Sequence, residues 1–286
     1  MKTSRGKVNR TAGGDAFVFL IIALFALVML MPIIYAVSSS LKPLNEFWVF
    51  PPQFIVRNPT MKNYRDLFGI LTESWIPLTR YVYNALFVSL TGTAGHVIIA
   101  SMCAYALSKH RFYGSQLLFK IIVFSLMFST AVTGIPLYLI MSTLKMVDTH
   151  WALIFPAFSA SLGLFLMKQF MDSMVPDAVI EAAKIDGSGE LRTIFSIVMP
   201  MVKPAWLTLI VFSFQSLWNN SAGAIFIQTE SKKMLNFVIA QIVAGGIARA
   251  GAAAAAIVFM MILPTVVFIV TQSSIVETMS SSGIKE

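Results

Sequence analysis

Charged residues are scarce in this sequence, and cysteine is almost absent. Only 12% of the 286 residues are Asp, Glu, Lys or Arg, which is about half the share of an average soluble domain. The single cysteine, Cys103, lies within an apolar run, so the chain can form no internal disulfide and build no metal cluster on thiolates. These shortages exclude a disulfide-stabilised secreted domain and argue against an ordinary soluble one.

Several signatures of energy coupling and catalysis are also missing. The sequence has no G-x-x-x-x-G-K-[ST] phosphate loop, so the chain does not bind ATP through that motif. No carboxylate lies well inside a long apolar run, whereas ion-coupled carriers usually place one near the middle of the membrane. No catalytic residues cluster at one depth, which argues against a membrane-embedded enzyme. We also predict no metal site in this chain.

Apolar residues dominate instead. They make up 57% of the sequence, and the mean hydropathy is +0.78. Several apolar runs approach the length of about twenty residues that a helix needs to cross a bilayer. The net charge of +8 is attributed to loops facing the cytoplasm and not to nucleic-acid binding. The first run is too long for a signal peptide, so we predict an uncleaved helix and an all-α polytopic membrane protein.

The apolar runs predict six membrane-spanning helices. The third run is interrupted near Gly134 and Pro136, where we predict a break. A cytoplasmic arm (residues 1–15) precedes a six-span domain (16–275), and a cytoplasmic tail (276–286) follows it. The predicted spans are residues 16–37, 83–107, 117–141, 151–170, 204–217 and 251–271.

The charges of the short loops predict the orientation of the chain. Residues 108–116 contain Lys109 and Arg111, and four cations lie in or beside the segment 176–200, which places both in the cytoplasm, whereas the loop 142–150 falls outside. The four cations are Lys168, Lys184, Arg192 and Lys203. The long loop 38–82 is rich in proline and aromatic residues and is expected to form a folded cap on the outer surface. Residues 235–243 are apolar enough to form a short or re-entrant helix.

The segment 176–200 combines charge, glycine and helical periodicity. Ala182 and Ala183 are expected to form an exposed surface of small side chains that a partner could approach closely. Gly187 can adopt positive φ and end the first helix, after which a second short helix follows. An ordinary amphipathic helix at the membrane interface fits the periodicity equally well. The charged residues that recur at spacings of four and three on one face are Asp177, Glu181 and Lys184.

The same segment resembles the signature of binding-protein-dependent ABC importer permeases. That signature reads Glu-Ala-Ala, three residues, Gly, nine residues, Ile, one residue, Leu-Pro, and its spacing is met throughout. Met199 is the one departure, because the family usually has Leu there. The matching positions are Glu181-Ala182-Ala183, Gly187, Ile197 and Pro200, with Asn84, Ala104-Tyr105-Ala106, Arg111-Phe112, Gly114, Ile135-Pro136-Leu137-Tyr138 and Trp218-Asn219 outside the segment.

The resemblance implies a six-helix (type I) ABC importer permease whose segment 176–200 is a cytoplasmic coupling helix. It implies a second permease as the partner in a heterodimer, two ATP-binding subunits that hold ATP and Mg, and an extracellular solute-binding protein. The likeness is to maltose-type inner permeases, so a carbohydrate is the expected substrate and a prokaryotic cell membrane the expected location. The chain itself would be a transport subunit without a cofactor, not an enzyme. The residues implied in ATPase coupling are Glu181, Ala182, Ala183, Asp186 and Gly187.

A second set of polar residues is a candidate substrate path. Sugars bind to aromatic faces and planar amides, and polar groups buried in a membrane are often functional. The alternative is hydrogen bonding between helices, or an aromatic belt in the case of Trp218. His96, within the second span, is expected to hydrogen-bond a neighbouring helix. The candidate path residues are Asn84, Gln215, Trp218, Asn219 and Asn220.

Overall fold

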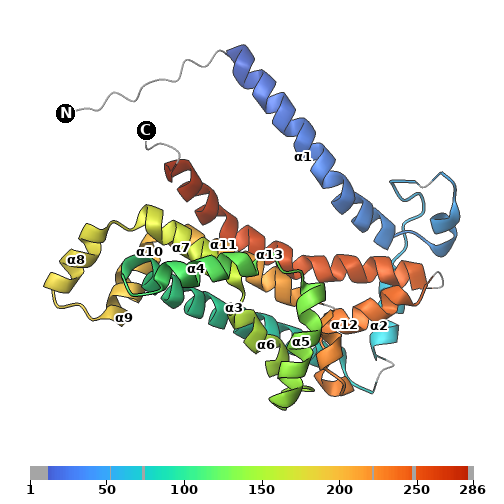
Figure 1. Ribbon diagram of the computed structural model, residues 1–286. Coiled ribbons are helices and arrows are strands. Elements are labelled where there is room, and N and C mark those ends of the chain that lie inside the picture. The colour runs from blue at the N-terminus through green and yellow to red at the C-terminus, as the bar shows by residue number, and fades with distance from the viewer. Residues whose placement is uncertain (1–11, 52, 73–74, 221, 247–248, 283–286) are drawn as a thin grey trace. The chain divides into compact units, whose positions relative to one another are not determined.

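The computed structural model describes residues 12–51, 53–72, 75–220, 222–246 and 249–282, and every regular element in these ranges is helical. The predicted all-α class is therefore confirmed (Figure 1). Residues 1–11 of the predicted arm and 283–286 of the predicted tail lie outside the described residues. The chain divides into two units, residues 1–70 with 242–259, and residues 71–241 with 260–286.

The first unit contains helix α1 (Ala12–Ser40), the 3-10 helix η1 (Leu44–Trp48) and helix α2 (Lys62–Thr72). The side-chain amide of Asn63 donates to the carbonyls of Ser40 and Lys42 at 2.8 and 2.7 Å, which ties α2 to the end of α1. Glu46 accepts hydrogen bonds from the backbone N–H groups of Arg57 and Asn58. Most of the predicted cap is therefore folded.

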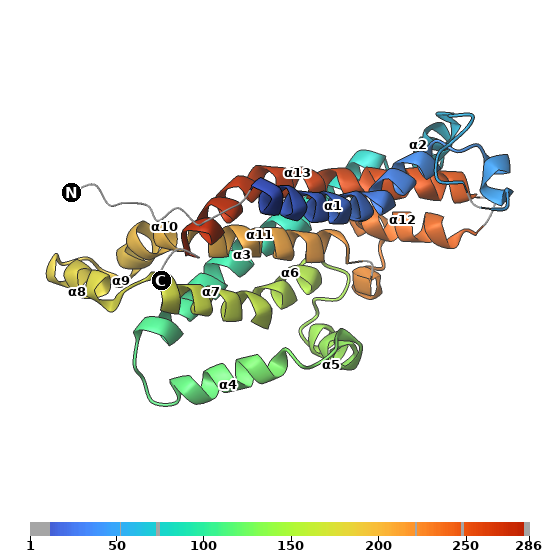
Figure 2. The same ribbon diagram turned by 90° about the horizontal axis from the view of Figure 1, so that it is seen from above.

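The second unit is a bundle built around α3 (Leu78–Lys109). Three helices pack along α3, namely α6 (Trp151–Phe158), α7 (Ser161–Met174) and α11 (Lys203–Trp218) (Figure 2). Helix α4 (Ser115–Ser125) lies against α7, where the rings of Phe119 and Phe165 stack. This unit also contains α5 (Thr130–Thr143), η3 (Ala222–Phe226) and η4 (Glu230–Lys232). Helices α12 (Leu235–Ala244) and α13 (Ala250–Ser282) each belong partly to both units, since residues 242–259 are assigned to the first. Helix α12 confirms the short helix predicted over 235–243.

Four helical stretches among the described residues are long and apolar enough to cross a membrane. They are Gly13–Ser40, Leu78–Lys109, Trp151–Met174 and Ala250–Gln272, which correspond to the first, second, fourth and sixth predicted spans. The fifth predicted span, α11, meets the same test only together with Glu190–Met201, to which it is joined at a bend of 87°.

The break predicted in the third span is in the wrong place. The chain leaves the helix at residues 126–129, whereas Gly134 and Pro136 both lie within α5. The hydroxyl of Ser125 donates to the carbonyl of Ile122 at 2.6 Å just before the break, and such local bonds compete with the helix ladder. The third span is therefore two shorter helices, α4 and α5.

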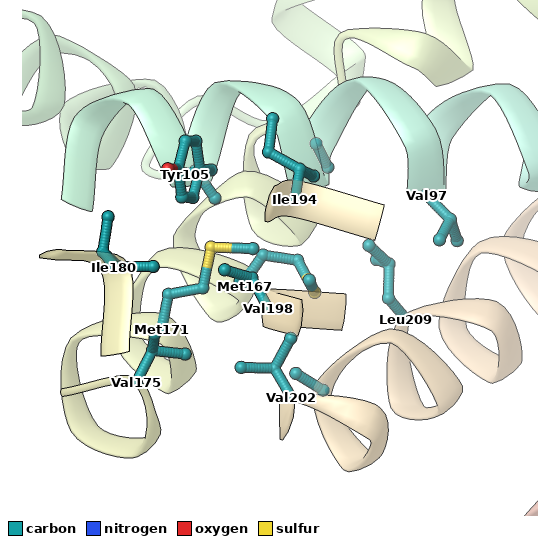
Figure 3. Packing of buried hydrophobic residues seen from close by; sticks show 13 residues of the cluster. Val97, Tyr105, Met167, Met171, Val175, Ile180, Ile194, Val198, Val202 and Leu209 are labelled. Atoms are coloured by element: carbon teal, nitrogen blue, oxygen red, sulfur yellow. The ribbon is translucent and has the colours of Figure 1, made fainter. Parts of the chain in front are cut away.

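A buried apolar cluster joins α3, α7 and α11 to the segment 176–200. Figure 3 shows its side chains pointing toward one another from these elements. Met167 and Met171 of α7 are fully buried within it, and unbranched methionine fills such irregular spaces well. The segment contributes Ile180, Ile194 and Val198 to this cluster. One face of the segment is therefore part of the bundle.

His96 of α3 and Gly163 of α7 lie against each other. The Nδ1 atom of His96 hydrogen-bonds the carbonyl of Ala157, which confirms the predicted helix-to-helix bond. A Cβ atom added to Gly163 would lie 1.9 Å from Nε2 of His96. Only glycine therefore fits at this position while the imidazole keeps its place.

Candidate functional site

The first half of the segment is helix α8 (Asp177–Ile185), which ends in a Schellman turn. Gly187 has φ +74°, and its N–H donates to the carbonyl of Lys184 at 3.0 Å. The N–H of Ser188 donates to the carbonyl of Ala183 at 2.9 Å. These two bonds, with a residue of positive φ between them, define the Schellman motif. The helix end predicted at Gly187 is confirmed.

The two faces of α8 have opposite environments. Ile180 and Ala183 are each 5% exposed and face the bundle. The prediction that Ala183 lies on the exposed surface is therefore wrong, because residues three apart on a helix share a face and Ile180 turns that face inward. The outward face, as we define it here, consists of Ala178, Glu181, Ala182 and Ile185, all of which are exposed.

The outward face of α8 is unusually apolar for a helix of 9 residues, which is too short to cross a membrane. Ile185 is 86% exposed, and Leu191, just beyond the turn, is 61% exposed. Neither residue was predicted to belong to the site, although Ile185 follows Ala178 and Ala182 at helical spacing. Large exposed apolar side chains beside a carboxylate are typical of a contact surface for a partner.

The start of α8 is anchored to α3 by an ion pair. Nζ of Lys109 lies 2.8 Å from the carboxylate of Asp177 and 2.6 Å from the carbonyl of Val175. The hydrogen bond and the charge of Lys109 lower the pKa of Asp177, and the charge of Arg111 lowers it further. The Lys109 side chain is only 6% exposed, whereas that of Asp177 is 76% exposed, so only the lysine of this pair is shielded from water.

A second anchor lies beyond the turn at Glu190. Its carboxylate accepts a hydrogen bond from the hydroxyl of Tyr105 at 3.0 Å. The same carboxylate lies 3.4 Å from Nε2 of His110 and 3.9 Å from Nζ of Lys184. Both halves of the segment are therefore held by residues at the end of α3.

The second half of the segment is a continuous helical stretch with a π-helical centre. It consists of α9 (Glu190–Arg192), the π-helix η2 (Thr193–Val198) and α10 (Met199–Met201), which confirms the second helix predicted there. The indole Nε1 of Trp206 in α11 donates to the carbonyl of Met199 at 3.0 Å across the bend. This bond links the end of the segment directly to the next helix of the bundle.

Two candidates for the substrate path are used in packing. Asn84 has no exposed surface, and its amide donates to the carbonyls of Ser231 and Lys233 at 2.9 Å each. Trp218 is 4% exposed, and its Nε1 donates to the carbonyl of Met260 at 3.0 Å. Neither side chain is open to a solute in this conformation, which favours the packing alternative for both.

The other three candidates lie near the end of α11. Gln215 is half-buried, Asn219 is exposed, and Asn220 is half-buried. The side-chain carbonyl of Asn220 accepts a hydrogen bond from the N–H of Gly223 at 3.0 Å. The structure thus brings these residues to one helix end, with Asn219 the most accessible of them.

A polar network ties two loops together near Asn84. The carboxylate of Asp148 lies 2.8 Å from Nζ of Lys232 and accepts hydrogen bonds from the hydroxyl and the N–H of Thr229. These contacts, from Lys232 first and Thr229 second, hold the pKa of Asp148 well below its usual range. The network is structural in character, since its groups bond to one another and to the backbone.

No group of three or more potential metal ligands occurs among the described residues. The arrangement with the clearest chemical meaning is therefore the segment 176–200. One of its faces is fixed to three helices, and the other presents an apolar and acidic surface.

Comparisons with known proteins place the chain among transport proteins. A family model described as "Binding-protein-dependent transport system inner membrane component" matches residues 96–280. The chain is 31% identical over 236 residues to the polygalacturonan/rhamnogalacturonan transport system permease protein YtcP of Bacillus subtilis (strain 168), covering 80% of this chain and 78% of that protein. It is 26% identical over the full length of both chains to the melibiose/raffinose/stachyose import permease protein MelC of the same strain.

A solved structure has the same fold. It is a chain of a bacterial ABC transporter involved in the import of the acidic polysaccharide alginate, with a TM-score of 0.73. The alignment covers 92% of this chain and 98% of that chain at 23% sequence identity.

Proposed function

Because this chain belongs to the family of binding-protein-dependent transport system inner membrane components, we propose that it is a permease subunit of an ATP-driven importer for an oligosaccharide or a related sugar. It is a multi-pass membrane protein. Membership of this family contradicts the alternative of an ion-coupled secondary carrier. The sugar class is supported by the names of the relatives, which refer to polygalacturonan/rhamnogalacturonan transport and to melibiose/raffinose/stachyose import.

The segment 176–200 is the coupling helix of this subunit. The observation that carries this proposal is its two-sided character: Ile180 and Ala183 are buried in the bundle, whereas Glu181, Ala182 and Ile185 are exposed. A cleft in an ATPase subunit would receive the outward face. Small and apolar side chains allow a close approach there, and the carboxylate of Glu181 can form a charge-assisted hydrogen bond with a basic partner.

The contacts of the segment explain how its movement would be transmitted to the helices of the permease. Lys109 and Glu190 fix its two halves to α3, and the buried cluster extends this contact to α7 and α11. Close-packed interiors move as rigid pieces and do not deform continuously. Movement of the coupling helices on ATP binding would therefore rock these helices together.

The other components of the proposed transporter are separate chains. A second permease completes the path as a heterodimer, two ATPase subunits bind ATP with Mg and hydrolyse it, and a solute-binding protein delivers the sugar from outside. This division of labour is supported by the lack of a phosphate loop in the sequence, and the permease chain itself is not an enzyme. With the coupling helix in the cytoplasm, both termini of the chain would face the cytoplasm of a prokaryotic cell.

Within the permease, Gln215, Asn219 and Asn220 are the better candidates for contact with the sugar. They retain exposed surface in this conformation, and planar amides can donate and accept hydrogen bonds to hydroxyl groups. Asn84 and Trp218 would instead shape the path by holding neighbouring segments in place.

The test is reconstitution of this chain in vesicles with the second permease, the ATPase and the binding protein encoded beside it. Uptake of labelled oligosaccharides should require ATP on the ATPase side and the binding protein on the other. Collapse of the proton and sodium gradients should leave the uptake unchanged. Uptake that follows an ion gradient without ATP would overturn the proposal.

A further inference from the structure

Apart from His110, which lies 3.4 Å from Glu190, the turn between α3 and α4 provides none of the hydrogen bonds or ion pairs described above. We call residues 110–120 the α3–α4 turn; it contains Arg111, Phe112 and Gly114, which match the family pattern. A cavity of about 750 Å³ opens on this turn. Both cations of its lining, Arg111 and Lys120, come from the turn, together with the polar side chains of Ser115 and Gln116.

These two cations lack the partners that their neighbours have. Lys109 pairs with Asp177 at 2.8 Å, and Lys168 pairs with Asp172 at 2.6 Å. Arg111 and Lys120 form no ion pair within the part of the chain that the structure describes, and Arg111 acts on Asp177 only through space. The turn itself contains no acidic residue. It therefore presents uncompensated positive charge around a cavity.

Apolar side chains stand beside these cations. Tyr113 is fully exposed, Phe112 is 42% exposed, and Leu117 is 63% exposed. The apolar surface continues along α4, where Ile121 and Phe124 are 56% and 59% exposed. Cations next to exposed aromatic rings, at the end of an apolar helix, are typical of the boundary between headgroups and acyl chains.

We propose that the α3–α4 turn binds an anionic phospholipid, with Arg111 and Lys120 at the headgroup phosphate and Phe112, Tyr113 and Leu117 among the upper acyl carbons. The turn lies at the same end of the bundle as the segment 176–200, because Lys109 and Asp177 join the two (Figure 2). The assignment to the cytoplasmic leaflet rests on the proposed function. A free phosphate would use the cations alone and would leave the apolar surface unexplained.

The site lies next to the first anchor of the coupling helix. Arg111 follows Lys109 by two positions and lines the cavity, and its charge also lowers the pKa of Asp177. A lipid phosphate that engages Arg111 would draw this positive charge away from Asp177 and leave Lys109 as its sole cationic partner. Anionic lipid would in this way influence how firmly α8 is attached to α3.

The test is native mass spectrometry of the full chain in detergent, titrated with dioleoyl phosphatidylglycerol. The double variant Arg111→Gln, Lys120→Gln should bind this lipid about 25-fold more weakly, since each cation near an anionic headgroup contributes about five-fold in affinity. The control variant Lys62→Gln, Lys145→Gln removes two exposed lysines outside the turn and should bind like the wild type. Dioleoyl phosphatidylcholine should bind weakly to all three proteins.

Three results would overturn the proposal. The first is equal phosphatidylglycerol affinity in the double variant and the control. The second is displacement of the lipid by inorganic phosphate at comparable concentration, together with unchanged affinity in Tyr113→Ser, Leu117→Ser, which would indicate a free-phosphate site. The third is that the double variant Arg111→Gln, Lys120→Gln binds the lipid like the wild type but no longer retains the ATPase subunit when the complex is purified, which would indicate a protein contact. Transport driven by an ion gradient would refute the proposed function while leaving this binding measurement intact.

Discussion

The hydroxyl of Tyr105 donates a hydrogen bond to the carboxylate of Glu190 at 3.0 Å. Tyr105 is 2% exposed inside the bundle, whereas Glu190 lies beyond the turn at Gly187, in the second half of the segment 176–200. Together with the pair of Lys109 and Asp177, this bond clamps both halves of the segment to one transmembrane helix. A clamp at two points resists rotation as well as translation, which transmission of force requires.

Tyr105→Phe should weaken the attachment of the second half of the segment 176–200 to α3 while the segment stays folded. The lost hydrogen bond to a half-exposed carboxylate should cost about 1 kcal/mol of local stability, seen as faster amide hydrogen exchange over residues 190–198. ATP-dependent uptake should fall several-fold while ATP hydrolysis by the complex continues. Tyr83→Phe removes a hydroxyl from an exposed position of the same helix and should change neither quantity. Equal exchange in both variants would refute the clamp.

Glu181→Lys should uncouple ATP hydrolysis from transport. The lysine would place like charge against a basic partner on the outward face of α8, so docking should weaken by about ten-fold or more. The measurement is recovery of the ATPase subunit on purification, followed by uptake. Asp66→Lys makes the same charge change on exposed α2 and should leave both readouts unchanged. Transport at the wild-type rate in Glu181→Lys would contradict the docking role.

Gly187→Val should destabilise the turn, and Gly189→Val should not. Neither glycine has an atom within 4 Å of an added Cβ, but Gly187 has φ +74°, whereas Gly189 has φ −70°. The left-handed backbone should cost the valine about 1–2 kcal/mol, while the extended backbone at Gly189 suits a β-branched residue. Yield of the assembled complex and its thermal midpoint should fall only for Gly187→Val. Equal loss in both variants would mean that backbone conformation is not the cause.

Gly163→Ala should destabilise the contact between α3 and α7 by about 1–3 kcal/mol, because the new methyl group would overlap the His96 ring. The change is measured as a lower thermal midpoint of the purified chain. His96→Ala in the same chain should recover part of the loss, since it removes the overlapping ring. Gly134→Ala, where nothing lies within 4 Å, is the matched helical control. Additive effects of the two substitutions would show that the ring and the glycine do not interact.

Asp148→Asn should lower stability at neutral pH and have little effect in acid. The carboxylate is held ionised by Lys232 and Thr229, and its pKa lies below the ordinary value of 3.8. Its network therefore contributes fully above that value and is lost as the pH falls below it. The gap between the thermal midpoints of the wild type and the variant should begin to narrow below about pH 4. It should continue to narrow as the pH approaches the lowered pKa of Asp148. A gap that stays constant down to pH 3 would assign the effect to the shape of the side chain and not to its charge.

Local rules carried much of the prediction. The Glu-Ala-Ala signature, the helix end at Gly187 and the helix predicted over 235–243 depend on residues within a few positions of one another, and each matches the structure. The break in the third span was predicted at the wrong place, because proline usually breaks a helix, whereas α5 continues through Pro136. Proline is tolerated in such helices, so its position alone does not locate a break.

The sequence by itself determined the class of the protein, the family and the two short helical stretches of the segment 176–200, because hydropathy, spacing and glycine conformation act locally. Only the tertiary structure decided which face of α8 is covered, which buried Ala183 and left Ile185 exposed. It likewise decided that Asn84 and Trp218 are occupied by backbone carbonyls far away in the chain. Helical periodicity specifies which residues share a face, but the neighbour that covers a face is brought there by the rest of the fold.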